Sequence, residues 1–210
     1  MNAACRVLAA CCALAACFSF VGCQSATFEP VYELRVTEAV IEDHAPDDAP
    51  DSRSVAVQVT WTADADGLVA NVSNPSDTTA IIDWEKAVIS VEGEPPTPLV
   101  STAPHTGPDV HQPPTVIPGH GQVIVGMLPA GEAEWTWLPN RAMGGSWHLA
   151  APLFGIAFDP GMSEAERQTI AETAVGRKLM VELPVRTGSR SFKHIYDIRV
   201  TGASARQVHR

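Results

Sequence analysis

Cysteine is absent from most of this 210-residue chain. All five cysteines stand within the first 23 residues: Cys5, Cys11, Cys12, Cys17 and Cys23. A protein cut at Cys23 has no second cysteine. An intramolecular disulfide, a cysteine-ligated zinc site and an iron–sulfur cluster are therefore excluded for the part that follows. That part has to fold by packing and hydrogen bonding alone.

Basic residues are also scarce, with 14 Lys and Arg against 24 Asp and Glu and a formal net charge of −10. Arg6 is the only charged residue among the first 23, so the remainder carries 13 basic and 24 acidic residues, a formal charge of −11. An acidic surface repels nucleic-acid phosphates and anionic lipid headgroups. We therefore expect no nucleic-acid partner, and any membrane attachment has to be apolar.

Catalytic signatures are missing as well. The sequence contains no phosphate-binding glycine loop, no dinucleotide fingerprint and no His-Glu-x-x-His motif. Ser146 and His148 stand close together, but not in the Gly-x-Ser-x-Gly arrangement of a nucleophile elbow. Glu132 and Glu134 could act as paired carboxylates, although exposed strands often carry such acids. We expect no cofactor and a protein that is not an enzyme.

The first 22 residues have the pattern of an export signal. Arg6 provides the positive start, residues 7–22 are uncharged and largely apolar, and Gly22 is a small residue before Cys23. The apolar run is shorter than the about 20 residues that a membrane-spanning helix needs, and no basic residue follows it directly. We predict a signal peptide over residues 1–22.

The end of this segment resembles the signal of bacterial lipoprotein precursors, in which an apolar pair and a small residue precede a cysteine that is lipidated. Phe20-Val21-Gly22-Cys23 has this form, with Phe where the family usually has Leu, and Leu14-Ala15-Ala16-Cys17 is the alternative. We favour Cys23, because a cut before Cys17 would leave an apolar stretch exposed on the mature protein. The resemblance implies acyl chains on the new N-terminal cysteine, which anchor the protein in a membrane.

The resemblance also implies an address. The residue after Cys23 is Gln24 and not the aspartate that commonly retains lipoproteins in the inner membrane. We therefore expect a lipid-anchored protein on the outer membrane of a Gram-negative cell, facing the periplasm. Residues 23–30 would form the acylated tether between the membrane and the folded domain.

Alternation of apolar and polar residues with a period of two dominates residues 31–201. The clearest case is residues 55–61 followed, after a turn at 64–67, by residues 68–72, which predicts a hairpin. Further alternating runs begin at Tyr32, Ala80, Ala87, Val123, Leu179 and Phe192. Short strands with turns between them predict an all-β domain, an antiparallel immunoglobulin-like β-sandwich.

One short helix is expected in this domain, because Ser163 and Glu166 have the spacing of a capping box and Gly176 can end the helix. The 93–121 segment is rich in proline and is expected to be a loop, and residues 202–210 a flexible tail. The expected core consists of Val57, Val59, Trp61, Ile82, Trp84, Val125, Val181, Leu183, Tyr196 and Ile198.

Part of the expected domain is similar to a hairpin of uncharacterised β-sandwich lipoproteins. The similarity rests on Asn71, on the Asn-Pro-Ser-Asp turn at residues 74–77, and on Ile82 and Trp84. It implies a fold and no activity.

Three tryptophans form the first candidate binding site. Trp135 and Trp137 would share one face of a strand, with Trp147 close by in the sequence. Tryptophan rings in such an arrangement can stack on sugar rings, or they can fill a core. The first interpretation would make the protein a glycan- or peptidoglycan-binding module.

Three histidines of the proline-rich segment form the second candidate site. His105, His111 and His120, together with Asp109, have side chains that bind Zn²⁺ or Cu²⁺. Their spacing matches no recognised ligand pattern, and the other interpretation is a solvated loop. A metal-binding periplasmic protein is therefore the second alternative function.

The leading hypothesis is a non-enzymatic envelope lipoprotein that binds another protein or scaffolds an assembly. The chain has an acidic β-rich domain without a catalytic constellation. Its proline-rich segment is suited to presenting contacts to a partner, because loops on a rigid scaffold commonly carry binding residues.

Overall fold

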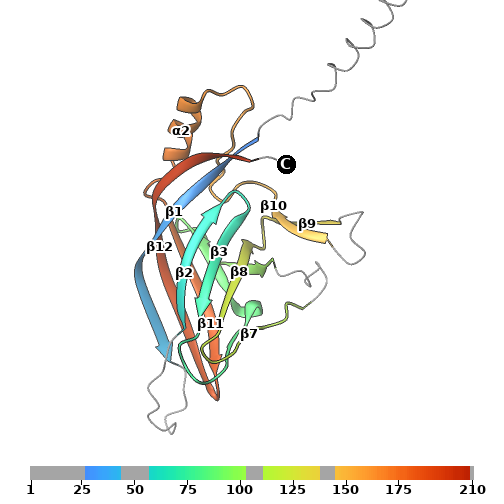
Figure 1. Cartoon of the computed structure of the whole chain (residues 1–210), viewed down its shortest axis with the longest axis vertical. Coiled ribbons are helices and arrows are strands. Elements are labelled where there is room, and N and C mark those ends of the chain that lie inside the picture. Colours follow the sequence, from blue (N-terminus) through green and yellow to red (C-terminus); the bar gives the residue numbers. More distant parts are fainter. Residues whose placement is uncertain (1–26, 44–56, 103–110, 138–144, 209–210) are drawn as a thin grey trace, which may run out of the picture.

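The structure, a computed structural model, describes residues 27–43, 57–102, 111–137 and 145–208 (Figure 1). Within these ranges every strand pairing is antiparallel, and the mainly-β antiparallel class with a single short α-helix is confirmed. The helices are the 3₁₀-helix η1 (Trp84–Lys86) and the α-helix α2 (Glu164–Glu172). The strands are β1 (Thr27–Asp43), β2 (Gln58–Asp64), β3 (Gly67–Ser73), β4 (Ala80–Ile82), β5 (Val88–Val91), β6 (Thr97–Ser101), β7 (Thr115–Ile117), β8 (Gln122–Pro129), β9 (Ala133–Trp137), β10 (Gly145–Leu149), β11 (Lys178–Thr187) and β12 (Arg190–Val208).

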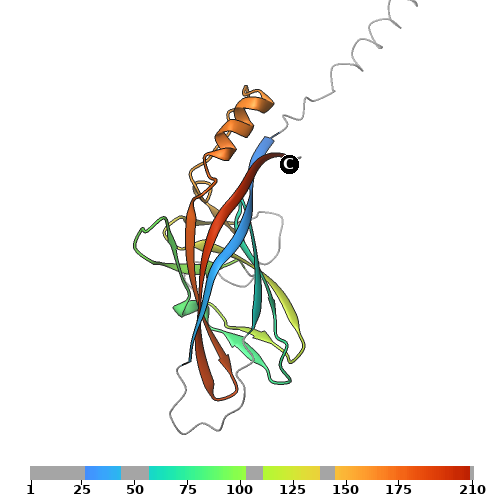
Figure 2. The same ribbon diagram turned by 90° about the vertical axis from the view of Figure 1, so that its left-hand side faces the viewer.

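Eight strands are hydrogen-bonded into a closed ring and so form a barrel. Their order is β12-β1-β2-β3-β8-β6-β5-β11, and β11 pairs again with β12. β4 and β7 extend from β11 as a branch, and β9 and β10 form a separate hairpin. Figure 2 shows β1 and β12 running side by side along the height of the domain.

This closure corrects the expected immunoglobulin-like sandwich, because a sandwich consists of two sheets that only pack face to face. Here two short corners complete the ring of strands, and each consists of two residue pairs. One joins β1 to β2 at residues 31–32, and the other joins β5 to β6 at residues 88–89. The first corner is followed by a register shift between Glu33 and Leu34. Such a bulge bends a strand, so β1 leaves β2 and continues beside β12.

The core agrees with the strand alternation. Nine of the ten residues expected in it are buried, and Val59 is partly buried and packs against it. The predicted β2–β3 hairpin is confirmed, and Gly67 makes its turn with a φ of +133°. A Cβ at Gly67 would also clash with the Leu128 side chain. Trp84 is fully buried but stands in η1 and not on a strand.

α2 begins where the sequence predicts a helix. The Glu166 N–H donates a hydrogen bond to the Ser163 hydroxyl, and the Ser163 N–H donates one to the Glu166 carboxylate, which completes the capping box. Gly176 follows the helix with a φ of +95°. The Arg167 guanidinium lies 3.6 Å from the centroid of the Phe28 ring and holds α2 against the start of β1.

Residues 202–208 belong to a strand, whereas the sequence predicts a flexible tail over residues 202–210. β12 continues to Val208, and residues 202–208 pair with residues 27–33 of β1. These residues are small and polar, and none of their side chains is buried, so their sequence has no apolar alternation that would indicate a strand. Their strand conformation comes from the pairing with β1. β1 itself begins at Thr27, inside the expected tether. The proline-rich segment likewise contains β6 and β7 in its described part.

In the described part of the chain, no helix has the length and apolar character needed to cross a membrane. The expected signal peptide lies outside that part, as do Cys17 and Cys23. The lipidation of Cys23 therefore stays a prediction.

Candidate functional site

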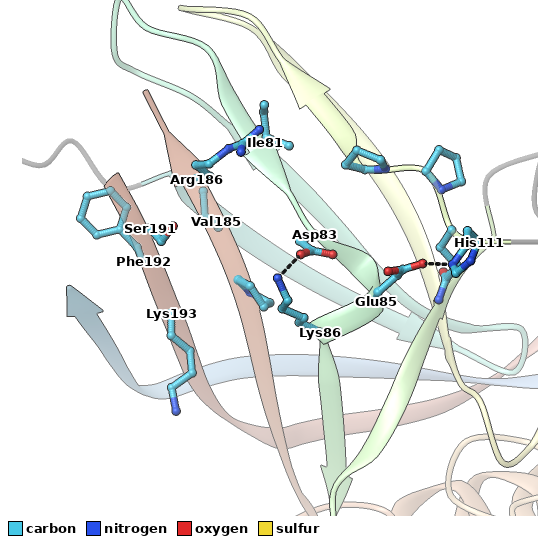
Figure 3. A pocket seen from close by; sticks show the side chains of 14 residues that line it. Ile81, Asp83, Glu85, Lys86, His111, Val185, Arg186, Ser191, Phe192 and Lys193 are labelled. Carbon is cyan, nitrogen blue, oxygen red and sulfur yellow. Dashed lines mark hydrogen bonds and ion pairs between the residues drawn. The ribbon is translucent and has the colours of Figure 1, made fainter. Parts of the chain in front are cut away.

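A groove with a cavity volume of about 830 Å³ lies along β4, β11 and β12 (Figure 3). Its lining comes from β4 and η1, from residues 111–114, and from the facing parts of β11 and β12. We call it the outer groove. Its volume is within the range of about 300–1,000 Å³ that is usual for ligand sites.

The floor of the outer groove is a row of outward-facing side chains. Pro184 and Arg186 alternate along β11 with buried apolar residues, so they point away from the core. Arg186 is directly opposite Ile81 of β4 and Ser191 of β12. Residues that are opposite in an antiparallel ladder share a face, and these three side chains therefore lie side by side.

One wall is formed by η1 and the segment before β7. Trp84 fixes η1, because its ring is fully buried and its Nε1 donates a hydrogen bond of 2.8 Å to Thr115 Oγ1. Gln112 fixes the segment through hydrogen bonds of 2.7 and 2.9 Å to the backbone of β6. His111 Nδ1 lies 2.5 Å from a carboxylate oxygen of Glu85, as Figure 3 shows. The wall is thus positioned by the core and by the sheet.

Ion pairs occupy both lysines of the outer groove. Lys86 Nζ lies 2.8 Å from an Asp83 oxygen, and this hydrogen bond raises the pKa of Lys86. Lys193 Nζ lies 3.0 Å from Glu42 and 3.5 Å from Glu182, and the hydrogen bond to Glu42 raises the pKa of Lys193. Such surface pairs contribute little to stability, but they leave the two ammonium groups with acidic partners.

Arg186 differs from the other cationic lining residues. Its guanidinium makes no hydrogen bond or ion pair with any residue that the structure describes, and its positive charge lies close enough to Lys86 to repel it. An arginine has five N–H donors in a planar fork that matches a carboxylate or a phosphate. The outer groove therefore offers an anion one uncompensated cation, with the apolar Ile81 and Phe192 also in its lining.

The tryptophan candidates lie on the β9–β10 hairpin. Trp135 is directly opposite Trp147, and their rings pack edge to face, with centroids 5.2 Å apart and planes at 68°. Both side chains are half-buried, and the side chain of Trp137 lies outside what the structure describes. Two rings at this angle present no shared flat face for a sugar.

Ser146 and His148 of the same hairpin line a second hollow of about 570 Å³. His148 lies 3.5 Å from a Glu134 oxygen and 3.4 Å from Thr136 Oγ1. Within the described ranges no hydrogen bond joins Ser146 to His148, and a nucleophile needs such contact with its base.

The histidine candidates for a metal site have separate acidic partners. His111 contacts the η1 carboxylate described above, and His120 Nε2 lies 2.7 Å from Asp77. His105 and Asp109 lie outside the described residues. Among the side chains that can be placed, no group of three or more His, Cys, Asp and Glu could hold a metal ion.

A histidine is buried in the interior of the barrel. His194 of β12 is 1% exposed, and its Nδ1 lies 3.1 Å from the Tyr196 hydroxyl. Its buried Nε2 has no hydrogen-bond partner in the structure as described. Burial lowers the pKa of His194 to about 4, so its imidazole is neutral at pH 7. Burial likewise raises the pKa of Tyr32 to about 12.

Sequence reasoning missed the outer groove. The alternation correctly places Arg186 on the outward face of its strand, but the neighbours of that face come from distant parts of the chain. Pairing of residues 80–82 with residues 185–187 brings them together. The segments share no motif, so only the sheet register could have indicated the site.

No protein-family model, curated protein or solved structure matches this chain. No relative therefore assigns a ligand or a reaction to the outer groove. What the groove can bind follows from its shape, its lining and its charge.

Proposed function

We propose that this protein is a lipid-anchored protein of the bacterial envelope that binds another protein through the outer groove. Acyl chains on Cys23 hold it on the outer membrane, facing the periplasm, and it catalyses no reaction. The observation that carries the binding role is Arg186, a cation without a described partner in a groove of about 830 Å³. The apolar segment that ends at Cys23 supports the anchor.

The outer groove fits an extended partner segment that carries a carboxylate next to an apolar side chain. Arg186 can hold a carboxylate by two parallel N–H···O bonds, which a lysine cannot do. Ile81, which is partly exposed, supplies apolar surface in the same groove, whereas Phe192 is buried on the inward face of β12. Hydrogen bonds to charged groups contribute about 1.5–3 kcal/mol each, so one well-placed acid would dominate this contact.

Pairing at an open strand edge is a weaker explanation. β7 has β4 as its only partner in the described sheet, but it is three residues long and lies between Pro114 and Pro118. Short strands with adjacent prolines resist the addition of another strand.

The two alternative functions have less support than protein binding. A glycan platform needs two rings that face a sugar together, whereas Trp135 and Trp147 pack against each other. A metal site needs converging ligands, whereas His111 and His120 each contact their own carboxylate.

Affinity capture from detergent-solubilised envelopes tests the binding role, with the wild type, Arg186→Glu and Arg35→Glu as baits. Arg35 is exposed on β1 and does not line the groove, so Arg35→Glu is a matched charge control. Support is a protein recovered by the wild type and by Arg35→Glu, but about tenfold less by Arg186→Glu, a loss of about 1.4 kcal/mol. Equal recovery by all three baits, or recovery of nothing, contradicts the proposal.

Mass spectrometry of the purified mature N-terminus tests the anchor separately. We expect a chain that begins with Cys23 and carries the mass of its acyl chains. An unmodified Cys23 or an intact Met1 would contradict it.

A further inference from the structure

We infer that the end of the domain that carries α2 faces the membrane at short range, and that the outer groove lies at the opposite end. This inference rests on the proposed acylation of Cys23. It assigns a lipid surface as the neighbour of the α2 end and leaves the groove free for a partner.

The tether between the lipidated cysteine and the fold is short. β1 begins at Thr27, four positions after Cys23. Four residues span at most about 13–14 Å when fully extended. Covalent geometry alone therefore keeps the Cα atom of Thr27 within about 14 Å of the Cα atom of the acylated Cys23.

The start of β1 lies beside α2 (Figures 1 and 2). Thr27 pairs with the last residue of β12. The Arg167 guanidinium of α2 lies over the Phe28 ring, and Gln168 Nε2 donates a hydrogen bond of 3.2 Å to the Ala203 carbonyl oxygen. α2 is thus attached to the part of the sheet that the tether holds near the membrane.

The outer groove lies toward the other end of the same strand. β1 ends at Asp43, which is directly opposite Phe192 of the groove lining. A strand of 17 residues is about 50 Å long at about 3.3 Å per residue, and bulges and twist shorten it somewhat. The groove is therefore several times farther from Thr27 than the tether is long.

Charge gives the α2 end no affinity of its own for a membrane. Glu164, Glu166 and Glu172 are exposed on α2, whereas Arg167 is buried against Phe28. The repulsion between these carboxylates and anionic headgroups is largely screened beyond about 8 Å at physiological ionic strength. The tether can be longer than this distance, so the repulsion does not prevent anchoring. The acyl chains therefore provide all of the attachment.

Energy transfer to labelled lipids measures this orientation, and the lack of cysteine after Cys23 makes labelling specific. Acylated protein with Glu164→Cys or Ser189→Cys carries a donor dye in phosphatidylcholine vesicles that contain a lipid with an acceptor-labelled headgroup. Glu164 is exposed in the first turn of α2, and Ser189 is exposed in the β11–β12 turn. We expect transfer to be at least about threefold more efficient at position 164, from a height difference of about 50 Å.

A flexible insertion is the control for the tether. About 20 Gly and Ser residues placed after Ser25 have a root-mean-square span of about 25 Å, and they should reduce the ratio between the two positions. Protein that floats with the vesicles but shows equal transfer at both positions, or more at Ser189, overturns the orientation and leaves the anchor intact. Protein that does not float overturns both.

Discussion

Acidification from pH 7.5 to pH 5.0 should destabilise the fold through His194, in addition to any effect of surface carboxylates. His194 is buried directly opposite apolar residues of β1 and β11, and its hydrogen-bond partner in the described structure is the Tyr196 hydroxyl. Asp43, an acid on the same face of β1, is held in an ion pair by Arg190. A proton on His194 Nε2 would therefore meet no acceptor.

The size of the effect follows from two pKa values. Burial lowers the pKa of His194 to about 4 in the folded protein, against 6.5 for a free histidine. Because the folded pKa is the lower one, the unfolded state takes up a proton first, and stability is lost as the pH falls from about 7 to about 4. A tenfold difference in proton affinity corresponds to about 1.4 kcal/mol. The full loss is therefore about 3 kcal/mol, and the loss between pH 7.5 and 5.0 is about 2 kcal/mol.

Urea unfolding at the two pH values measures this loss. His194→Gln removes the titrating group, His194→Leu is a second variant if the first does not fold, and His148→Gln changes a partly exposed histidine as a control. We expect the wild type and His148→Gln to lose about 2 kcal/mol more on acidification than the His194 variants. Equal losses in the wild type and in both His194 variants would refute the reasoning.

Variants at three further positions test local contacts by chemical denaturation. Trp84→Ala should lower the free energy of unfolding by about 3–5 kcal/mol, because the side chain is buried. Trp84→Phe mainly loses the hydrogen bond to Thr115 and should lower it by about 1 kcal/mol. A loss below about 1 kcal/mol for Trp84→Ala would mean that the side chain is not in the core. Asn74→Ala should cost about 2–4 kcal/mol, because its amide donates to three backbone carbonyl oxygens and accepts from Ser76, and an unchanged stability would show that these bonds are not formed. Ser163→Ala should cost about 1 kcal/mol and speed hydrogen exchange in α2, and unchanged exchange would contradict the capping box.

Strand periodicity is a local property, and the sequence alone therefore predicted much of the sheet. Along β2 and the residue before it, Val57 and Trp61 are buried and Gln58 and Thr60 are exposed, as the alternation requires. The capping box at Ser163 is equally local and predicted the start of α2. Each of these signals lies within a few residues of the element that it predicts.

Closure of the ring could not be predicted in the same way. It depends on two corners of two residue pairs each, and on a bulge after Glu33 that sends β1 away from β2. The last residues of β12 are ordered by their pairing with the start of β1, a strand far away in the sequence. Without that register, their small and polar side chains resemble a tail.

The candidate site was missed for a related reason. Sequence reasoning selected tryptophans and histidines, whose side chains have distinctive chemistry. Arg186 is an ordinary surface residue until its neighbours are known. Lys86 pairs with Asp83, three residues before it, and Lys193 pairs with acids of two neighbouring strands, whereas Arg186 has no partner among the residues described. The lack of an acidic partner for Arg186 depends on the tertiary arrangement, and no pattern in the sequence could show it.

Pro184 lies at the point of β11 where the pairing partner changes, and it also lines the outer groove. Proline removes a ladder donor and is unusual inside a central strand. β11 pairs with β5 up to Glu182 and with β4 from Val185, so Pro184 stands where β11 changes partner. Its carbonyl oxygen accepts a 3.1 Å hydrogen bond from the Asp83 N–H. In an antiparallel strand the N–H and the C=O of one residue point to the same side, so the absent N–H of Pro184 would have faced β4 and not β12. No hydrogen bond to β12 is therefore lost. The chain runs from β4 through η1 to β5, and η1 therefore leaves the sheet at this change of partner to form the wall of the groove.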